Sequence, residues 1–372
     1  MKISIITLHA VSNYGSVLQT VATDAFWKEM GLEVEFLNYK REDCRSIALF
    51  LRKEWYKKPN ILFPIKALIY LPTLIRWKFV FDRFIKDNIK TTEKVYTYEE
   101  DFSEIPDADI YCTGSDQVWN SKLNNGILGM FYLDYVPDNK KRISFAASFG
   151  KDTLDEWEKR ETKSLLSKYD YITVREKSGV DIIKDLGIYN VEQFLDPTLL
   201  FGSNHWNKYA SDRMSKSKYL FVYQLHYNEG IEQFINEIAK TKGLKVVRLC
   251  YRYDEVIKKG KCLIIPKVKD FLGCIKHAGM VITDSFHATA FSVNYNVPFI
   301  SILPKEQFGG RIHSLLELTG LEDRLIFEDY SVEKACSSVD FTFANKVLDE
   351  QRISIRNKFK SLIESWNENT SC

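Results

Sequence analysis

The chain has 372 residues, of which 52 are basic and 50 are acidic, and 45% of its residues are hydrophobic. A chain of this length exceeds what one hydrophobic core usually holds, so two domains are expected. Because the charges nearly balance, no overall field recruits nucleic acid or a membrane surface, and any anion has to be bound by a local site.

The first forty residues predict a β-strand, a helix and a second β-strand. Residues 2–8 are an apolar run rich in β-branched side chains, residues 16–30 are amphipathic, and residues 33–39 form another apolar run. This order is typical of a βαβ unit, which forms a parallel sheet covered by helices. The same alternation continues along the chain, and we expect a doubly wound, Rossmann-like domain over residues 1–203.

A basic and aromatic segment interrupts this domain over about residues 45–95. Residues 51–90 hold ten Lys or Arg but three acidic residues, and Pro64, Lys66 and Pro72 interrupt the apolar part. That part is shorter than the ~20 residues that a membrane-spanning helix needs. Two interpretations are open. A helical excursion packed on the first domain is favoured, because apolar stripes are usually core; a surface that lies on anionic lipid is the alternative.

The strand and helix pattern restarts after a polar, lysine-rich stretch at residues 202–218. The restart predicts a second Rossmann-like α/β domain over residues 204–343, facing the first domain across a cleft. Residues 344–372 contain a long amphipathic pattern. We expect a closing C-terminal helix there that packs back on the first domain.

The compartment is predicted from the N-terminal residues and the cysteines. The start lacks a long apolar region and a small-residue cleavage site, and the seven cysteines are scattered with no CxxC pair. These features argue against secretion, a disulfide framework and a zinc site, so a cytoplasmic protein without a structural metal or a cofactor is expected. A loosely bound Mg²⁺ on a phosphate substrate stays compatible with the sequence.

Polar side chains follow several predicted strands, where ligands bind in parallel α/β sheets. The first such loop places Asn13, Tyr14 and Gly15 at the start of a helix, where backbone N–H groups attract anions. Helix capping is an equally open role for Asn13.

The second such loop contains Ser115, Asp116 and Gln117, a polar density that can bind sugar hydroxyls, with Trp119 as a stacking face. A capped turn with Trp119 in the core is the favoured alternative for this loop.

The third and fourth loops contain the charged candidates. Arg175 and Glu176 leave an apolar strand as a helix begins, and an arginine fork there suits a phosphate or carboxylate. The alternative is that Arg175 neutralises a buried carboxylate. Asp284, Ser285 and His287 stand between a strand and an apolar helix, where a nearby carboxylate and a helix N-terminus can tune an imidazole.

Two further segments have weaker signals. Arg311 follows two glycines that let the backbone approach a ligand, so Arg311 is either a second anion ligand or a solvated cap. Asp196 precedes Pro197 near the predicted domain boundary, and we expect this segment to form a mainly structural turn.

Six motifs in order along the chain carry a family resemblance: NYGSVLQ, GSDQVWN, SFAASFG, VREKSG, LDPTLL and TDSFHATAFSVNYNVPFI. As an ordered set, they resemble the polysaccharide pyruvyl transferase family over almost the whole chain. The resemblance implies two Rossmann-like domains arranged as in GT-B glycosyltransferases, with the active site between them. It also implies phosphoenolpyruvate as the donor and a hexose of a surface or capsular glycan, free or lipid-linked, as the acceptor.

The resemblance implies roles for the candidate residues. Arg175 and Arg311 would bind the donor, and His287 would contact its phosphate or protonate C3. Asp284 or Glu176 would position His287 or deprotonate the acceptor hydroxyl. This chain departs from many relatives at Ser285, where they carry arginine.

The same features leave two other function classes open. A GT-B glycosyltransferase would share the fold and the strand-end site, and a non-catalytic glycan-binding protein would keep the scaffold without the chemistry. If the acceptor is linked to lipid, the protein would work at the inner face of the membrane.

Overall fold

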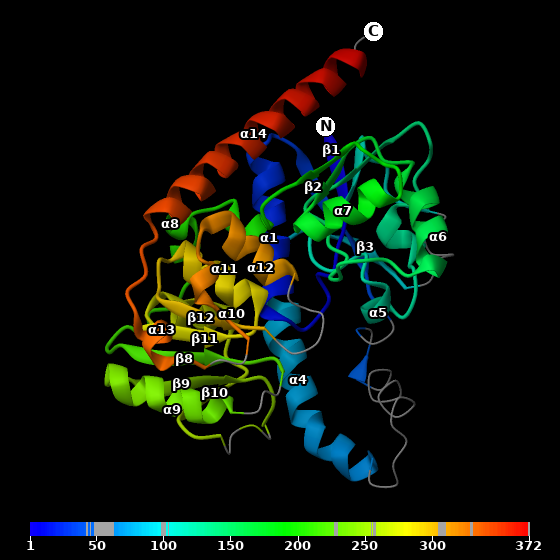
Figure 1. Cartoon of the computed structure of the whole chain (residues 1–372). Coiled ribbons are helices and arrows are strands. Elements are labelled where there is room, and N and C mark those ends of the chain that lie inside the picture. The colour runs from blue at the N-terminus through cyan, green and yellow to red at the C-terminus, as the bar shows by residue number, and fades with distance from the viewer. Residues whose placement is uncertain are drawn as a thin grey trace.

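Two α/β lobes form the body of the molecule, and helix α14 (Thr342–Thr370) runs along both of them (Figure 1). This computed structural model describes residues 1–41, 44, 46–47, 63–97, 102, 104–226, 230–253, 255, 258–303, 310–327 and 330–370. The first part of the basic segment, including Trp55 and Tyr56, lies outside the described residues.

The first lobe is built on a parallel five-stranded sheet. Apart from a polar edge strand at residues 91–96, its strands are short apolar runs whose side chains are mostly buried on both faces, as expected for a sheet covered by helices. A two-stranded parallel sheet extends its edge through isolated bridges of Ile143 with Tyr171 and of Ala147 with Val174. In spatial order, the strands are β3 (Thr91–Tyr96), β2 (Glu33–Tyr39), β1 (Lys2–Ile6), β4 (Ile110–Thr113), β5 (Lys141–Ser144), then β6 (Ile172–Val174) and β7 (Val191–Gln193).

The helices of the first lobe connect these strands. Asn13 caps the first of them by accepting hydrogen bonds from the backbone N–H groups of Gly15 and Ser16 at 2.8 and 3.3 Å. The helices and 3₁₀ turns are α1 (Tyr14–Glu29), α4 (Phe63–Asn88), α5 (Ser121–Asn124), η2 (Gly129–Tyr132), α6 (Glu156–Leu166), α7 (Lys177–Asp185) and η3 (Pro197–Leu199). After them, α8 (Ser203–Asn207) leads into the second lobe, where its Trp206 packs against Phe291 with 5.0 Å between ring centroids.

The second lobe repeats the architecture with a parallel six-stranded sheet. In spatial order, its strands are β10 (Lys261–Ile264), β9 (Lys245–Cys250), β8 (Tyr219–Tyr223), β11 (Met280–Thr283), β12 (Phe299–Ile302) and β13 (Leu325–Ile326). Its helices and 3₁₀ turn are α9 (Ile231–Lys242), α10 (Val268–Lys276), α11 (Phe286–Asn294), α12 (Gly310–Thr319), η5 (Glu322–Arg324) and α13 (Val332–Cys336). The predicted α/β fold of two Rossmann-like lobes is confirmed.

Helix α14 packs back on the first lobe, as the sequence predicts. The buried ring of Phe359 lies 5.7 Å from Phe26, 4.8 Å from Trp27 and 5.5 Å from Phe145, measured between ring centroids. Arg356 adds an ion pair of 2.7 Å to Glu29 at the end of α1. The helix therefore ties the end of the chain to its beginning.

Helix α4 bridges the two lobes. The Thr73 hydroxyl accepts a hydrogen bond from the Tyr253 backbone at 3.3 Å, and Trp77 donates its indole N–H to the Tyr251 carbonyl at 2.9 Å. The basic segment is therefore helical over part of its length, but the sequence stretch to residue 95 also includes β3, an edge strand of the first sheet.

The other face of α4 leaves Leu68, Ile75 and Phe79 exposed. Contact of this face with anionic lipid stays a prediction. None of the helices in the described ranges has the length and apolar character needed to cross a bilayer.

Candidate functional site

A groove of about 440 Å³ lies between the two lobes. The N-terminus of α1 and the loop after β4 line it from the first lobe, and the loops after β8 and β11 and the start of α12 line it from the second. These segments follow the carboxyl ends of parallel strands, where the sequence predicts a site. The basic and imidazole side chains that line the groove are Arg41, Lys122, His226, His287 and Arg311.

The structure separates the predicted site residues into two groups. Those that line the groove are Asn13, Asp116, Gln117, Asp284, Ser285, His287 and Arg311. Those that lie behind its walls are Tyr14, Gly15, Ser115, Arg175 and Glu176.

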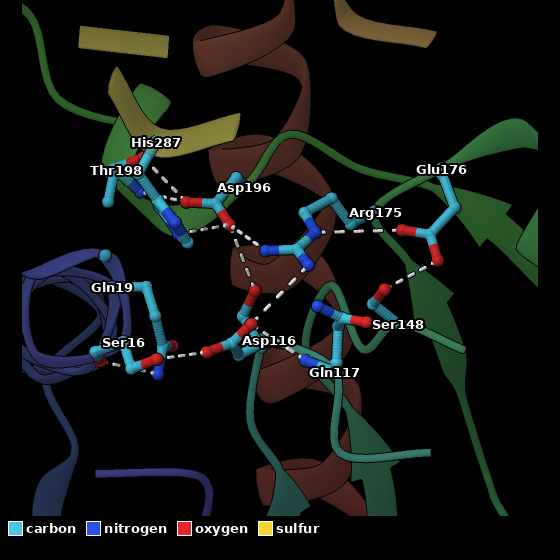
Figure 2. A network of polar contacts seen from close by, with 12 residues as sticks. Ser16, Gln19, Asp116, Gln117, Ser148, Arg175, Glu176, Asp196, Thr198 and His287 are labelled. Atoms are coloured by element: carbon cyan, nitrogen blue, oxygen red, sulfur yellow. Dashed lines mark hydrogen bonds and ion pairs between the residues drawn. The ribbon is translucent and has the colours of Figure 1, made fainter. Parts of the chain in front are cut away.

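Asp196 is the centre of a buried polar network behind the groove (Figure 2). Its Oδ2 accepts a hydrogen bond from Arg175 Nη1 at 2.8 Å and one from Ser115 Oγ at 3.3 Å, and it lies 3.7 Å from His287 Nε2. Its Oδ1 accepts from the backbone N–H and hydroxyl of Thr198 at 2.9 and 2.6 Å. Burial opposes ionisation, yet His287, Arg175 and Thr198 together hold the pKa of Asp196 well below its ordinary value.

Arg175 neutralises this buried carboxylate, and the side chain does not reach the groove. Its guanidinium lies between Asp196, Asp116 and Glu176, with the latter two each 3.7 Å away, and stacks over the Phe286 ring at 4.7 Å (Figure 2). The sequence predicts Arg175 as a direct anion ligand, but these contacts fit the alternative, a structural pair.

Asp116 adopts a left-handed backbone conformation, with φ of 80°. Side chains of this kind tolerate the region, but a strained backbone there costs about 1–3 kcal/mol and needs support from its surroundings. Oδ2 accepts a hydrogen bond from Ser16 at 2.5 Å, and Oδ1 accepts from the Gln117 backbone at 2.9 Å. Burial acts to raise the pKa of Asp116, but Arg175, His287 and Ser16 lower it overall. Asp116 is therefore an ionised carboxylate in the groove wall.

His287 reaches the groove from the first turn of α11 and packs against the backbone of Gly15. A Cβ atom added to Gly15 would lie 1.9 Å from Nδ1 of the ring. Nε2 of His287 is buried and has no hydrogen-bond partner within the described part of the chain. Because Asp196 Oδ2 is 3.7 Å from this nitrogen, the carboxylate can stabilise a protonated imidazole without binding it tightly.

Arg311 presents a cation in the groove wall without a matching carboxylate. Among the described residues, no carboxylate oxygen lies within 4.0 Å of it. With its oxygen oriented toward Arg311, the Gln117 amide accepts from Nη2 and Nη1 at 3.0 and 3.2 Å. Burial and the nearby Arg175 lower the pKa of Arg311 from 12.5 to about 10, so the guanidinium stays charged at neutral pH.

Asp284 does not pair with His287, contrary to the sequence-based hypothesis. Its carboxylate accepts hydrogen bonds from the backbone N–H groups of Leu225 and His226 at 2.7 and 2.8 Å, and contacts His226 Nδ1 at 3.1 Å. The contact with Asp284 raises the pKa of His226 above its ordinary value. Sequence reasoning missed His226, although it follows the apolar strand β8 as the other candidates follow theirs.

Several other predicted ligands have structural roles. Tyr14 is fully buried and donates its hydroxyl to the Pro266 carbonyl of the second lobe at 2.7 Å. Glu176 accepts from Ser148 Oγ at 2.7 Å, deep in the first lobe. Ser285 caps α11, and Trp119 is a core residue that stacks on Tyr132. Tyr14 and Glu176 therefore lie behind the groove wall, paired with groups of the protein.

Within the described ranges, no three His, Cys, Asp or Glu side chains are grouped so that they could hold a metal ion. The groove instead has the character of an anion site, because the N-termini of α1 and α11 both face it and add partial positive charge to that of Arg311.

Comparison with protein families identifies the chain's relatives. The family model of the polysaccharide pyruvyl transferases matches residues 13–306, which include most of the groove. The chain belongs to the polysaccharide pyruvyl transferase family. Among curated protein sequences, none matches the chain. Arg311 lies shortly after residue 306, where the match to the family model ends.

Solved structures with the same arrangement of lobes are distant in sequence. A putative UDP-N-acetylglucosamine 2-epimerase from Listeria monocytogenes has a TM-score of 0.54 at 11% identity, over 96% of this chain and 90% of that one. The UDP-GlcNAc 2-epimerase from Methanocaldococcus jannaschii, in complex with UDP-GlcNAc and UDP, has a TM-score of 0.50 at 12% identity, over 95% and 94%. At this identity, the likeness shows the fold alone, which is that of GT-B enzymes.

Proposed function

We propose that this polysaccharide pyruvyl transferase family member transfers pyruvate from phosphoenolpyruvate to two hydroxyl groups of a hexose in a surface or capsular glycan. The product is a cyclic ketal, and inorganic phosphate is released. The family and the groove between two lobes support this proposal, and the single observation that carries it is the presence of both Arg311 and His287 in the lining of one groove.

The donor determines what the site needs. Phosphoenolpyruvate is a small, multiply charged anion, so a site has to supply fixed cations and N–H donors that compete with water. Arg311 lines the groove and has no ion pair with the described residues, and the N-termini of α1 and α11 provide backbone N–H groups. Arg175 contributes indirectly, because it keeps Asp196 ionised behind His287.

The reaction needs an acid and a base in turn. The first acceptor hydroxyl adds to C2 of the enol phosphate, and a proton is delivered to C3, which becomes a methyl group. The second hydroxyl then attacks C2 and displaces phosphate, which leaves with the remaining proton. Of the two hydroxyl protons, one ends on C3 and the other on phosphate, so the reaction consumes no other reagent.

We infer that His287 moves these protons, because its ring lines the groove. Among the described residues, none forms a hydrogen bond with its buried Nε2, and Asp196, 3.7 Å away, can stabilise the imidazolium. An imidazolium in this position can protonate C3, and the neutral ring can then accept the proton of an attacking hydroxyl. General acid–base catalysis of this kind typically contributes ~10²–10⁴ in rate.

Ligand-induced thermal shifts test the donor. Phosphoenolpyruvate at about 100 times its Kd should stabilise the protein by about 2.7 kcal/mol. Arg311→Gln should abolish this shift, because the variant removes the charge that lacks a carboxylate. Arg83→Gln, on the exposed face of α4 and paired with Asp87, serves as the matched control and should keep the shift. Stabilisation by UDP-sugars but not by phosphoenolpyruvate would instead favour a glycosyltransferase, and a response to neither ligand would favour a glycan-binding protein.

Phosphate release tests the catalytic role. With the host's surface glycan as acceptor, His287→Gln should lower the rate ~10²–10⁴-fold and leave the thermal shift with phosphoenolpyruvate in place. Turnover near the unmodified rate in His287→Gln would show that the proton transfer occurs elsewhere.

A further inference from the structure

A second hollow, which we call the side pocket, opens on the first lobe beside the groove. It has a volume of about 620 Å³, within the range of small-molecule sites. Its lining comes from the loop around α5, the loop after β5 and the start of α6: Asn120, Ser121, Lys122, Asn125, Gly126, Gly150, Lys151, Asp152, Thr153, Asp155 and Trp157.

The floor of the side pocket is held in place by its own contacts. Lys151 Nζ lies 2.6 Å from Glu158 Oε2 and donates to Ser121 Oγ at 2.9 Å. Since Glu158 neutralises Lys151, this lysine adds no net charge to the floor. The hydrogen bonds order the surface on which a ligand would rest.

The rim carries groups that face solvent. Asp152, Thr153 and Asp155 are exposed, and the Trp157 indole is 58% exposed. Within the described part of the chain, the Asp152 carboxylate forms no hydrogen bond or ion pair. A single exposed aromatic residue needs no explanation by itself, but this one stands in the wall of a polar pocket.

These groups select one class of ligand. Exposed carboxylates accept hydrogen bonds from hydroxyl groups, and an indole face packs against the apolar C–H face of a pyranose ring. Apart from the paired Lys151, the described lining holds one cation, Lys122, against the carboxylates of Asp152 and Asp155, so its net negative charge disfavours an anion such as phosphoenolpyruvate. A neutral polyol therefore suits the side pocket, whereas an anion suits the groove with Arg311.

The side pocket and the groove adjoin each other. Both are lined by Lys122 and Asn125. The side-chain amide of Asn120, in the side pocket, contacts that of Gln117, in the groove, at 2.7 Å. Asp152, on the rim of the side pocket, packs against Gly310. A Cβ atom added to Gly310 would lie 2.6 Å from Oδ1 of Asp152. Gly310 precedes Arg311, so a ligand in the side pocket lies next to the anion site.

We propose that the side pocket binds the neutral saccharide acceptor, with the pyranose ring on Trp157 and its hydroxyl groups on Asp152 and Asp155. This inference rests on the proposed function for its identification of the ligand as the acceptor. Because the side pocket adjoins the groove, an acceptor bound there would lie beside the donor.

Saturation-transfer NMR with the methyl glycosides of glucose, galactose and mannose tests the side pocket. At least one glycoside should receive saturation on its ring C–H protons from the unmodified protein. Trp157→Ala should weaken its binding about fivefold or more. Tyr189→Ala removes another exposed aromatic residue from the first lobe, 77% exposed, and should bind the glycoside as before.

The thermal shift that phosphoenolpyruvate causes, measured on the same variants, separates this inference from the proposed function. Retention of that shift in Trp157→Ala, together with loss of the glycoside, is the expected result. Equal glycoside binding by Trp157→Ala and the unmodified protein would overturn the inference, as would the failure of every glycoside while phosphoenolpyruvate still stabilises the protein. Glycoside binding that depends on Trp157, without any phosphoenolpyruvate shift, would support the side pocket and overturn the donor.

Discussion

Gly15 lies so close to the His287 imidazole that no larger side chain fits between them. A Cβ atom there would stand 1.9 Å from Nδ1 and 2.3 Å from Cγ, so the whole ring would have to move. Since the ring is placed by packing against this backbone, a glycine at position 15 is a condition for the 3.7 Å approach of Nε2 to Asp196.

Gly15→Ala should therefore reduce phosphate release by about 10²-fold, the typical cost of misplacing a catalytic group by 1 Å. The melting temperature should also fall, because the added Cβ atom forces the buried His287 ring to shift, and overpacking of this kind typically costs about 1–3 kcal/mol. Gly129→Ala is the control, since an added Cβ there meets nothing nearer than 3.5 Å. Full activity in Gly15→Ala, measured beside that control, would show that the ring position does not govern the rate.

Asp196 shows what the sequence could not predict at this scale. The segment reads as a turn, and Asp196 does cap the 3₁₀ turn η3 through Thr198. Its second role, as the shared partner of Arg175 and His287, depends on the tertiary structure. The end of β6 and the start of α11 bring these two side chains to the same oxygen of Asp196. Candidates such as His287 and Asn13 were found because they directly follow strands, whereas a partner from a third segment leaves no local signal.

At the scale of elements, α14 is the part of the fold that joins distant segments most directly. Phe359 is fully buried among aromatic rings of the first lobe, while Phe343, on the same helix, is 58% exposed. The two residues are both phenylalanines on the same helix, and they differ in burial.

Phe359→Ala should lower the free energy of unfolding by about 3–5 kcal/mol, because it leaves a cavity in a packed aromatic cluster. Phe343→Ala should change it by about 0.5 kcal/mol or less. Urea unfolding followed by circular dichroism measures both. If the two variants unfold at the same urea concentration, α14 contributes no core to the first lobe.

The helix periodicity of residues 345–366 predicted α14, but the sequence did not predict that α4 would hold the two lobes together. Its Arg76 donates to the Ile265 carbonyl at 3.2 Å, and its Trp77 to Tyr251 at 2.9 Å. Both acceptors are backbone carbonyls of the second lobe, and a carbonyl acceptor leaves no trace in residue identity. A local pattern identifies a helix, but it does not identify the element against which that helix packs.

At the scale of the whole molecule, the sequence predicted most strands of both sheets, because most are short apolar runs that open into polar loops. The polar edge strand β3 has no such pattern and was not predicted. Parallel strands place those loops on one edge, so the position of the groove followed from the fold. The sequence did not predict which side chains line the groove and which lie behind it. Arg175 and Asp284 both follow strand ends as expected, but Arg175 binds Asp196, and Asp284 binds the backbone of Leu225.

The stability of the whole molecule should depend on pH through buried histidines. His9 is fully buried beside the Thr7 carbonyl, and burial lowers its pKa from 6.5 to about 4. His205, in α8 against Phe201 and Trp206, is shifted in the same direction to about 4. In both cases the folded chain keeps the imidazole neutral where the unfolded chain would protonate it.

Above pH 6.5, both states hold a neutral His9, so the contribution of this group is complete. As the pH falls from 6.5 to about 4, only the unfolded state takes up the proton, and stability falls. At about 1.4 kcal/mol per pKa unit, His9 alone accounts for about 3 kcal/mol. The lowered pKa values of Asp116 and Asp196 act later, because their stabilising charge is lost only as the pH falls below their ordinary range.

Urea unfolding at pH 7 and pH 4.5 should therefore give a lower free energy of unfolding at pH 4.5. His9→Gln removes the titrating ring and keeps a donor for the Thr7 carbonyl, so this variant should lose a large part of the difference between the two pH values. His313→Gln, at an exposed position of α12, is the control and should keep the full difference. Equal pH dependence in His9→Gln and His313→Gln would place the titrating group elsewhere in the molecule, whereas a smaller dependence in His9→Gln alone would assign it to the buried imidazole after β1.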